Sequence, residues 1–133
     1  MRSLNVNYSK VADLGPLRGM ATLRDLSLAD TAVTDLSPLH GLPMLRWLEL
    51  GGSAVKDLTP LQGTALDVLR IGGTRVADLS PLAALPLNEL DCTAILAGDF
   101  SPIASCTKLV HLNITGTTVK DLNEFWTEQE AAK

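Results

Sequence analysis

The chain repeats a short pattern, Val-x-Asp-Leu-x-Pro-Leu, every 21 or 22 residues. The clearest copies lie at residues 33–39, 55–61 and 76–82, an earlier copy begins at Val11, and looser copies follow at 97–103 and 119–125. A period of this length is typical of solenoid proteins, in which each copy is one small unit that cannot bury its own apolar side chains. The repeat therefore predicts that successive copies stack and bury a shared core.

We number the positions of each copy so that Met1 and Leu23 stand at position 1 of the first and second copies. Aliphatic residues recur at positions 1, 4 and 6, and the alternation of positions 4 and 6 is typical of a strand with one buried face. Position 11 is Val in most copies, and positions 14 and 17 are mostly Leu. We expect all of these side chains to point into the coil.

The outer side of each copy is marked by a small or polar residue at position 15, followed by Pro in all copies but the last. Gly15, Ser37 and Thr59 are examples, and such residues are good helix N-caps with Pro at the first helical position. Each copy is therefore expected to enter a short helical or 3-10 turn. The predicted fold is an α/β solenoid, a right-handed coil with a parallel sheet on its concave face.

The pattern Leu-x-x-Leu-x-Leu-x-x-Thr-x-Val-x-Asp-Leu-Ser-Pro-Leu resembles the leucine-rich repeat of about 22 residues that is found in bacterial internalins. The resemblance covers residues 1 to about 126 and implies a leucine-rich-repeat solenoid. The family usually carries Asn at position 9, where this chain has Ser, Thr or, in the copy at 87–108, Ile95. We expect a local distortion in that copy.

The repeats are assigned to residues 1–122, about six copies, and residues 123–133 to a C-terminal capping helix or tail. The end of the chain, Glu124-Phe125-Trp126 and a charged segment, is similar to the C-terminal repeat arrays of planctomycete-type serine/threonine kinases. This second resemblance implies an alternative function, a structural spacer or cap domain from a larger kinase-like protein, with no ligand of its own.

Composition excludes several classes of protein. The formal charge of −4 and the pI near 5.0 argue against a nucleic-acid partner. The sequence has neither the roughly 18 apolar residues of a membrane span nor a signal peptide. Cys92 and Cys106 do not make a disulfide framework, and we expect reduced core thiols, with a bridge left open for a secreted protein. The compartment is not fixed, although these features favour the cytoplasm.

No set of residues predicts catalysis, a metal or a cofactor. The Asp at position 13 of every copy could form a metal-binding row, but an Asp two residues before a turn is better explained as an acceptor for backbone N–H groups. His111 is expected to face Glu89 across one strand spacing, with Asp91 diagonal to it, and one imidazole is a thin basis for a metal site. We expect a protein that is not an enzyme.

Positions 3, 5 and 7 differ between copies and are expected to point to the concave side, which makes them candidates for binding an unidentified protein. Trp47 is predicted to face water with Val68 beside it, and Arg70 to lie between Glu49 and Asp91; exposed aromatic residues among charges are where interfaces concentrate their energy. The predicted partner-binding residues are Asp25, Trp47, Glu49, Val68, Arg70, Glu89, Asp91 and His111.

The first strand is expected to carry Leu4 and Val6 as its inward pair, with nothing before it to cover the edge. Exposed edges and apolar ends recruit partners. The chain is therefore predicted either to be a fragment of a longer array or to form a homodimer through its N-terminal strands.

Overall fold

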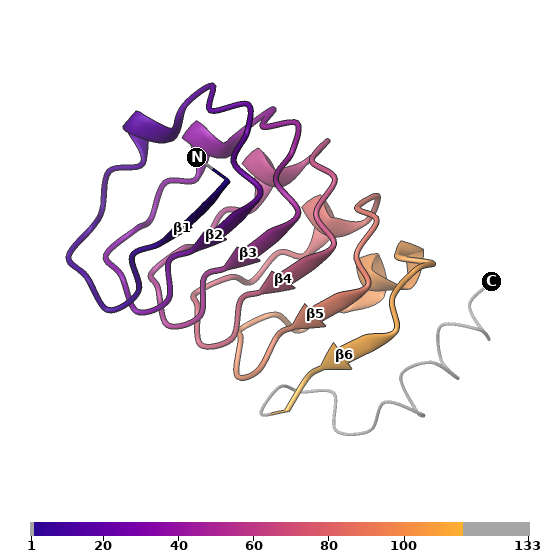
Figure 1. The fold of residues 1–133 in the computed structure, drawn as a ribbon. Coiled ribbons are helices and arrows are strands. Elements are labelled where there is room, and N and C mark those ends of the chain that lie inside the picture. Colours follow the sequence, from indigo (N-terminus) through magenta and orange to yellow (C-terminus); the bar gives the residue numbers. More distant parts are fainter. Residues whose placement is uncertain (1, 116–133) are drawn as a thin grey trace.

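A computed structural model describes residues 2–115 of the 133-residue chain. It contains six short strands and five 3-10 segments that alternate along the sequence (Figure 1). The strands are β1 (Ser3–Asn5), β2 (Asp25–Ser27), β3 (Trp47–Glu49), β4 (Val68–Arg70), β5 (Glu89–Asp91) and β6 (His111–Asn113). The 3-10 segments are η1 (Gly15–Leu17), η2 (Ser37–Leu39), η3 (Thr59–Leu61), η4 (Ser80–Leu82) and η5 (Ser101–Ser105).

All six strands pair in parallel in the order β1-β2-β3-β4-β5-β6. Each residue pairs with the residue at the same position of the next copy, as Leu26 does with Leu48 and Leu48 with Leu69. Figure 1 shows the strands side by side along one side of the coil and the 3-10 segments on the other. The predicted leucine-rich-repeat solenoid is thus confirmed, and its outer segments within residues 2–115 are all 3-10 turns.

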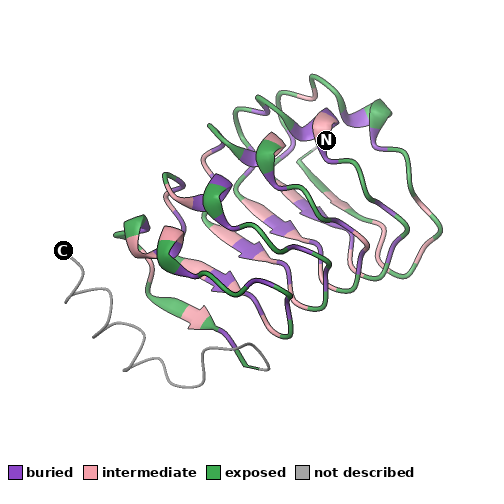
Figure 2. Ribbon diagram, turned by 180° about the vertical axis from the view of Figure 1, so that it is seen from behind, coloured by how far each residue is buried: buried purple, intermediate pink, exposed green. Residues whose placement is uncertain are grey.

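The core is a continuous aliphatic column inside the coil. Leu26, Leu48, Leu69 and Leu90 at position 4 are completely buried, as are most of their neighbours at positions 6, 11, 14 and 17. Figure 2 shows this burial in the middle strands and much more exposure on β1 and β6. At the ends of the described sheet, Leu4 and Leu112 are only partly buried against the core.

The start of each 3-10 segment is held by the Asp at position 13. Its Oδ1 accepts the backbone N–H of position 15, at 2.8–2.9 Å in all five described copies, which confirms the expected role of these aspartates. The prediction that position 15 is the N-cap was wrong. The 3-10 segment already begins at position 15, so its first N–H needs an acceptor from the preceding residues, and the Asp side chain supplies it.

The hydroxyl at position 9 bonds within its own copy. Ser9, Thr31 and Thr74 donate to the carbonyl oxygen at position 6, three residues earlier, at 2.6–2.8 Å. Ser53 occupies the same place, but its buried Oγ has no hydrogen-bond partner. In the copy at 87–108, Ile95 is buried instead, and η5 is longer than the other 3-10 segments, while β5 keeps the regular pairing with β6. The expected distortion is therefore confined to the outer side.

Position 8 follows each strand and has a positive φ in the five copies in which it is described. Gly52 and Gly73 have φ values of 74° and 69°, and Tyr8, Asp30 and Ala94 take 59°, 54° and 55°. This left-handed region suits glycine and is a genuine outlier for a bulky side chain. The tight turn at the carboxyl end of the strands thus imposes the same backbone on five different copies.

The predicted C-terminal cap at 123–133, with Phe125 and Trp126, lies outside the described residues. Within residues 2–115, no helix has the length and apolar character needed to cross a membrane.

Candidate interaction surface

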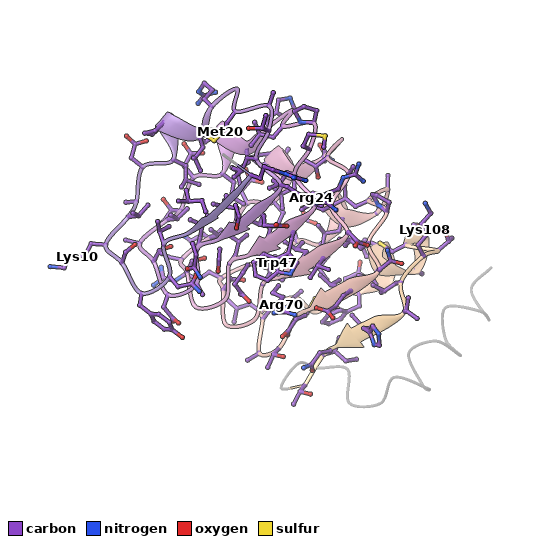
Figure 3. All side chains as sticks on the ribbon, in the orientation of Figure 1. Lys10, Met20, Arg24, Trp47, Arg70 and Lys108 are labelled. Atoms are coloured by element: carbon purple, nitrogen blue, oxygen red, sulfur yellow. The ribbon has the colours of Figure 1, made fainter. Side chains whose placement is uncertain are left out.

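One whole face of the sheet carries the side chains of positions 3 and 5, and we call this the concave face. No described element covers it (Figures 1 and 3). The in-phase pairing of the strands places Trp47 beside Val68, and Glu89 beside His111. The structure thus brings the predicted partner-binding residues together on one surface. Parallel sheets are normally buried on both faces, so an open face of this kind is unusual.

Trp47 and Arg70 lie together at the centre of this face (Figure 3). The guanidinium carbon of Arg70 is 5.5 Å from the centre of the Trp47 ring, a distance at which a cation and an aromatic face attract each other. Trp47 is half-buried rather than directed fully into water. Part of its ring is therefore already engaged by Arg70, a contact that sequence reasoning missed.

Arg70 is held mainly by Glu89. Its Nε and Nη2 donate to Oε2 of Glu89 at 3.1 and 2.9 Å, and its Nη1 lies 3.9 Å from Oε2 of Glu49. The prediction that Arg70 lies between Glu49 and Asp91 is confirmed by the strand register, but its ion pairs are with Glu89 and Glu49 rather than with Asp91. Asp91 pairs with Arg70 in the strand register, but its carboxylate is used elsewhere.

Asp91 belongs to a second row of acceptors that close the turn after each strand. Its Oδ1 accepts both the backbone N–H and the hydroxyl of Thr93, at 2.9 and 2.6 Å. Glu49 accepts the N–H of Gly51 in the same way at 2.7 Å. Asn5 and Asn113 accept the N–H two residues later in their own copies. Much of position 5, which we expected to be free for a partner, thus also serves the fold.

Two shallow hollows lie on the concave face. A hollow of about 630 Å³ extends over β4–β6 and is lined by Arg70, Glu89, Asp91 and His111, with the exposed Val110 at its margin. A second hollow of about 580 Å³ lies over β1–β3, and its lining includes Asp25 and Trp47.

The lining of the second hollow also includes Asn7 and Tyr8, which sequence reasoning missed. Tyr8 is 80% exposed. A signal for it existed, because Tyr8 aligns with Asp30, Gly52, Gly73 and Ala94, so a large aromatic residue stands where the other described copies use smaller ones.

The described residues offer little for chemistry. Among residues 2–115, no three His, Cys, Asp or Glu side chains converge where a metal could bind. His111 faces Glu89 in the register, as predicted, and is exposed. The absence of a catalytic function remains a prediction.

Both cysteines are free thiols in the core. Burial and the neighbouring Asp91 raise the pKa of Cys92 to about 12, and burial also raises the pKa of Cys106. The Cys106 thiol donates to the carbonyl oxygen of Leu82 at 3.2 Å. Because thiolates are the reactive form, neither side chain is a nucleophile at neutral pH in this setting.

Comparisons with known proteins agree on the architecture. No family model matches the chain, and no curated protein matches it. Among solved structures, the chain is similar to an internalin (InlF) from Listeria monocytogenes, with a TM-score of 0.74 and 28% identity over 92% of this chain. It also resembles the functional domain of InlJ from the same organism, with a TM-score of 0.69 and 22% identity over 97% of this chain.

The chain corresponds to 44% of the InlF chain and 28% of the InlJ chain. The functional domain of InlJ includes a cysteine ladder. In the present chain Cys92 and Cys106 occupy positions 6 and 20 of a single copy and do not form a ladder within residues 2–115. The shared feature is therefore the bacterial leucine-rich-repeat fold.

Proposed function

We propose, from the internalin-type leucine-rich-repeat fold of this chain, that it is a non-enzymatic protein-interaction module that binds its partner on the concave face. The observation that carries the proposal is the open face of the parallel sheet, with a half-exposed Trp47 at its centre. Tryptophan and arginine are enriched among the residues that dominate binding energy in protein interfaces. Both stand here in direct contact.

The outer side of the coil is a weaker candidate. Its most regular polar feature, the Asp of position 13, is already used to hold the 3-10 turns, and it is the same in every copy. Position 3, by contrast, changes from Asp25 to Trp47 to Val68 along the sheet. A surface that differs from copy to copy is better suited to recognise one particular partner.

The test is capture of a partner by the immobilised chain and by two variants. Trp47→Ala is expected to weaken binding by about tenfold or more, because truncation of a central aromatic anchor leaves its contacts unmade. Leu96→Ala is the matched control: Leu96 is 71% exposed but lies beyond the turn that follows β5, outside the concave face. Its removal should leave binding unchanged.

The alternative function, a spacer or cap domain without a ligand, makes the opposite prediction. In that case no partner is captured by the folded chain, and Trp47→Ala changes only the thermal midpoint, which it lowers. Loss of binding by Trp47→Ala at an unchanged midpoint favours the interaction module.

Self-association is a further part of the proposal. Strand β1 pairs only with β2 in the described sheet, and Leu4 and Val6 pack only partly against the core. A second copy that adds its own β1 antiparallel to this edge would cover both ends at once, as an isologous contact does.

A further inference from the structure

The hollow over β1–β3 lies on an acidic part of the concave face. The concave face carries the carboxylates of Asp25, Glu49, Glu89 and Asp91 against one arginine, Arg70. Arg70 is already bound twice to Glu89 and lies against Trp47. Asp25, by contrast, makes no ion pair with any described residue. Arg70 also lines the hollow over β1–β3 and lies 3.9 Å from Glu49, but it is shared with Glu89. Asp25 is therefore the carboxylate of this hollow that has no ion pair among the described residues.

Two aromatic side chains border the same hollow, Trp47 from β3 and Tyr8 from the turn after β1. The faces of aromatic rings are electronegative and attract cations, more strongly when carboxylates stand nearby. Arginine already uses one such ring within the molecule, since Arg70 lies 5.5 Å from the Trp47 centroid. The chemistry of the hollow thus matches a positively charged group.

Tyr8 is held there against its local preferences. Its φ is 59°, a conformation that costs free energy for a bulky residue, and its side chain is 80% exposed. Its exposed ring contributes little packing that could offset this cost. The turn imposes this backbone on position 8 of every described copy, so the fold accounts for the φ value but not for the ring. What Tyr8 adds to the hollow is an exposed aromatic side chain, where Gly52 and Gly73 carry none.

The polar groups of the hollow are fixed in place. Oδ1 of Asn7 accepts the hydroxyl of Ser27 at 2.5 Å and the backbone N–H of Ala29 at 2.8 Å, and these two bonds hold the amide in place. Glu49 is held by the N–H of Gly51. Binding to groups that are already ordered costs less conformational entropy.

We propose that the hollow over β1–β3 receives a lysine or arginine side chain from a basic segment of the protein partner. The cation would lie near the exposed ring of Tyr8 and the carboxylate of Asp25, because Trp47 and Glu49 are already shared with Arg70. This proposal rests on the proposed function, since it names the chemistry of the partner at the same face. It places the anchor on the N-terminal half of the sheet, whereas Arg70 serves as an internal support for Trp47.

The test uses a fluorescently labelled, lysine-rich peptide and two controls of equal length, one with glutamate and one with acetyl-lysine at the same places. Binding is followed by fluorescence anisotropy at low and at physiological ionic strength. The parent chain should bind the lysine peptide and neither of the two controls. Its affinity for the lysine peptide should fall at the higher ionic strength, because salt screens the charges. Failure of the parent chain to bind this peptide overturns the proposal.

Three substitutions locate the site. Tyr8→Gly removes the ring and relieves the backbone, so affinity should fall about tenfold while the thermal midpoint stays the same or rises. Tyr8→Asn, which also tolerates this backbone, checks the result. Ala94→Gly makes the same kind of backbone change at φ 55° far from the hollow and should leave affinity unchanged.

The pair Asp25→Asn and Asp91→Asn removes one charge inside and one outside the hollow, and Asn at residue 91 can still accept the Thr93 N–H. Only Asp25→Asn should weaken binding. Equal effects of the two substitutions would show attraction to overall charge and would overturn the proposal. If the natural partner is lost with Trp47→Ala but not with Tyr8→Gly, the interaction module stands and the cation site does not.

Discussion

At the scale of single residues, the hydroxyl groups of position 9 differ in whether they make a hydrogen bond. Thr31 and Thr74 donate to the carbonyl oxygen three residues earlier, at 2.8 and 2.7 Å, from buried positions. Ser53 is equally buried and has no partner for its Oγ. A buried polar group without a hydrogen bond costs free energy that a bonded one recovers.

This difference predicts opposite effects of removing the hydroxyl. Thr31→Val should lower the free energy of unfolding by about 1 kcal/mol, because the carbonyl oxygen of Leu28 loses its donor. Ser53→Ala should leave the free energy unchanged or raise it slightly, since no bond is lost. Urea unfolding of both variants measures this. A larger loss for Ser53→Ala than for Thr31→Val would contradict the assigned bonds.

The aspartates of position 13 make the stability of the fold depend on pH. Hydrogen bonds from the backbone and hydroxyl of Ser37 lower the pKa of Asp35, and the same kinds of bond from Thr59, Ser80 and Ser101 lower the pKa values of Asp57, Asp78 and Asp99. A carboxylate with a depressed folded pKa stabilises the fold above its unfolded pKa, near 3.8, and loses that contribution as the pH falls through the folded pKa.

We therefore expect the free energy of unfolding to be constant from neutral pH down to about pH 5 and to fall below about pH 4. Replacing these four aspartates by Asn keeps an oxygen acceptor for each turn but removes the titration. The variant should unfold with a weaker dependence on pH in acid, measured by urea titration at several pH values. An unchanged acid slope would mean that other carboxylates control it.

At the scale of elements, the turn after each strand sets the spacing of the copies. Gly52 and Gly73 have nearly the same φ, but their surroundings differ. A Cβ at Gly52 would overlap Oδ1 of Asp30 in the preceding copy, whereas at Gly73 the nearest atom would be 3.7 Å away. One turn is therefore crowded by its neighbour and the other is not.

Gly73→Ala should cost about 1 kcal/mol, the usual penalty of a side chain in the left-handed region. Gly52→Ala should cost about 1 kcal/mol more, because the added methyl also displaces the Asp30 carboxylate. Asp30→Gly in the Gly52→Ala background should remove this excess. The three unfolding free energies, compared with that of the parent chain, test the packing directly, and equal costs at both glycines would refute it.

The elements show where sequence reasoning succeeds and where it stops. Leu26, Val55 and Leu79 were predictable as core because each has counterparts at the same position in other copies. The contact between Trp47 and Arg70 was not, since it depends on the rotamers of two side chains that occur once. The capping by Asp91 was missed because only the distance to Thr93, not the strand register, distinguishes a cap from a cross-strand pair.

The same limit applies to the candidate site. Its face and most of its residues follow from the period, because positions 3 and 5 project from one side of every strand. The period does not show, however, how far each of these residues serves the fold and how far it is free to bind a partner. Glu49 serves Gly51 and Arg70 at once, and Asn7 completes the turn of the next copy. Such double roles can be recognised only when the positions of neighbouring copies in space are known.

At the scale of the whole molecule, both ends of the described sheet leave apolar side chains only partly buried. At β1 the residues Leu4, Val6, Val11 and Met20 are only partly buried against the core. The backbone N–H groups of Val6 and Tyr8 donate to the carbonyl oxygens of Ser27 and Ala29 in the next copy, so those of the alternate residues in β1 face away from the sheet. An edge of this kind, with partly buried apolar side chains beside it, can pair with a second copy.

We therefore expect the isolated chain to dimerise at about micromolar concentration, with its mass rising with concentration in light scattering. Val6→Glu should shift the chain to the monomer, because a charge at the joint between two apolar ends would be buried without a partner. Val110→Glu places the same charge near β6, at a residue that is 72% exposed, and should leave the mass unchanged.

The association should also persist at high salt, since apolar burial drives it and salt screens only charges. A parent chain that stays monomeric at high concentration, or a Val6→Glu chain that still dimerises, would exclude the β1 edge as the contact and leave the partner of the concave face as the ligand of the molecule.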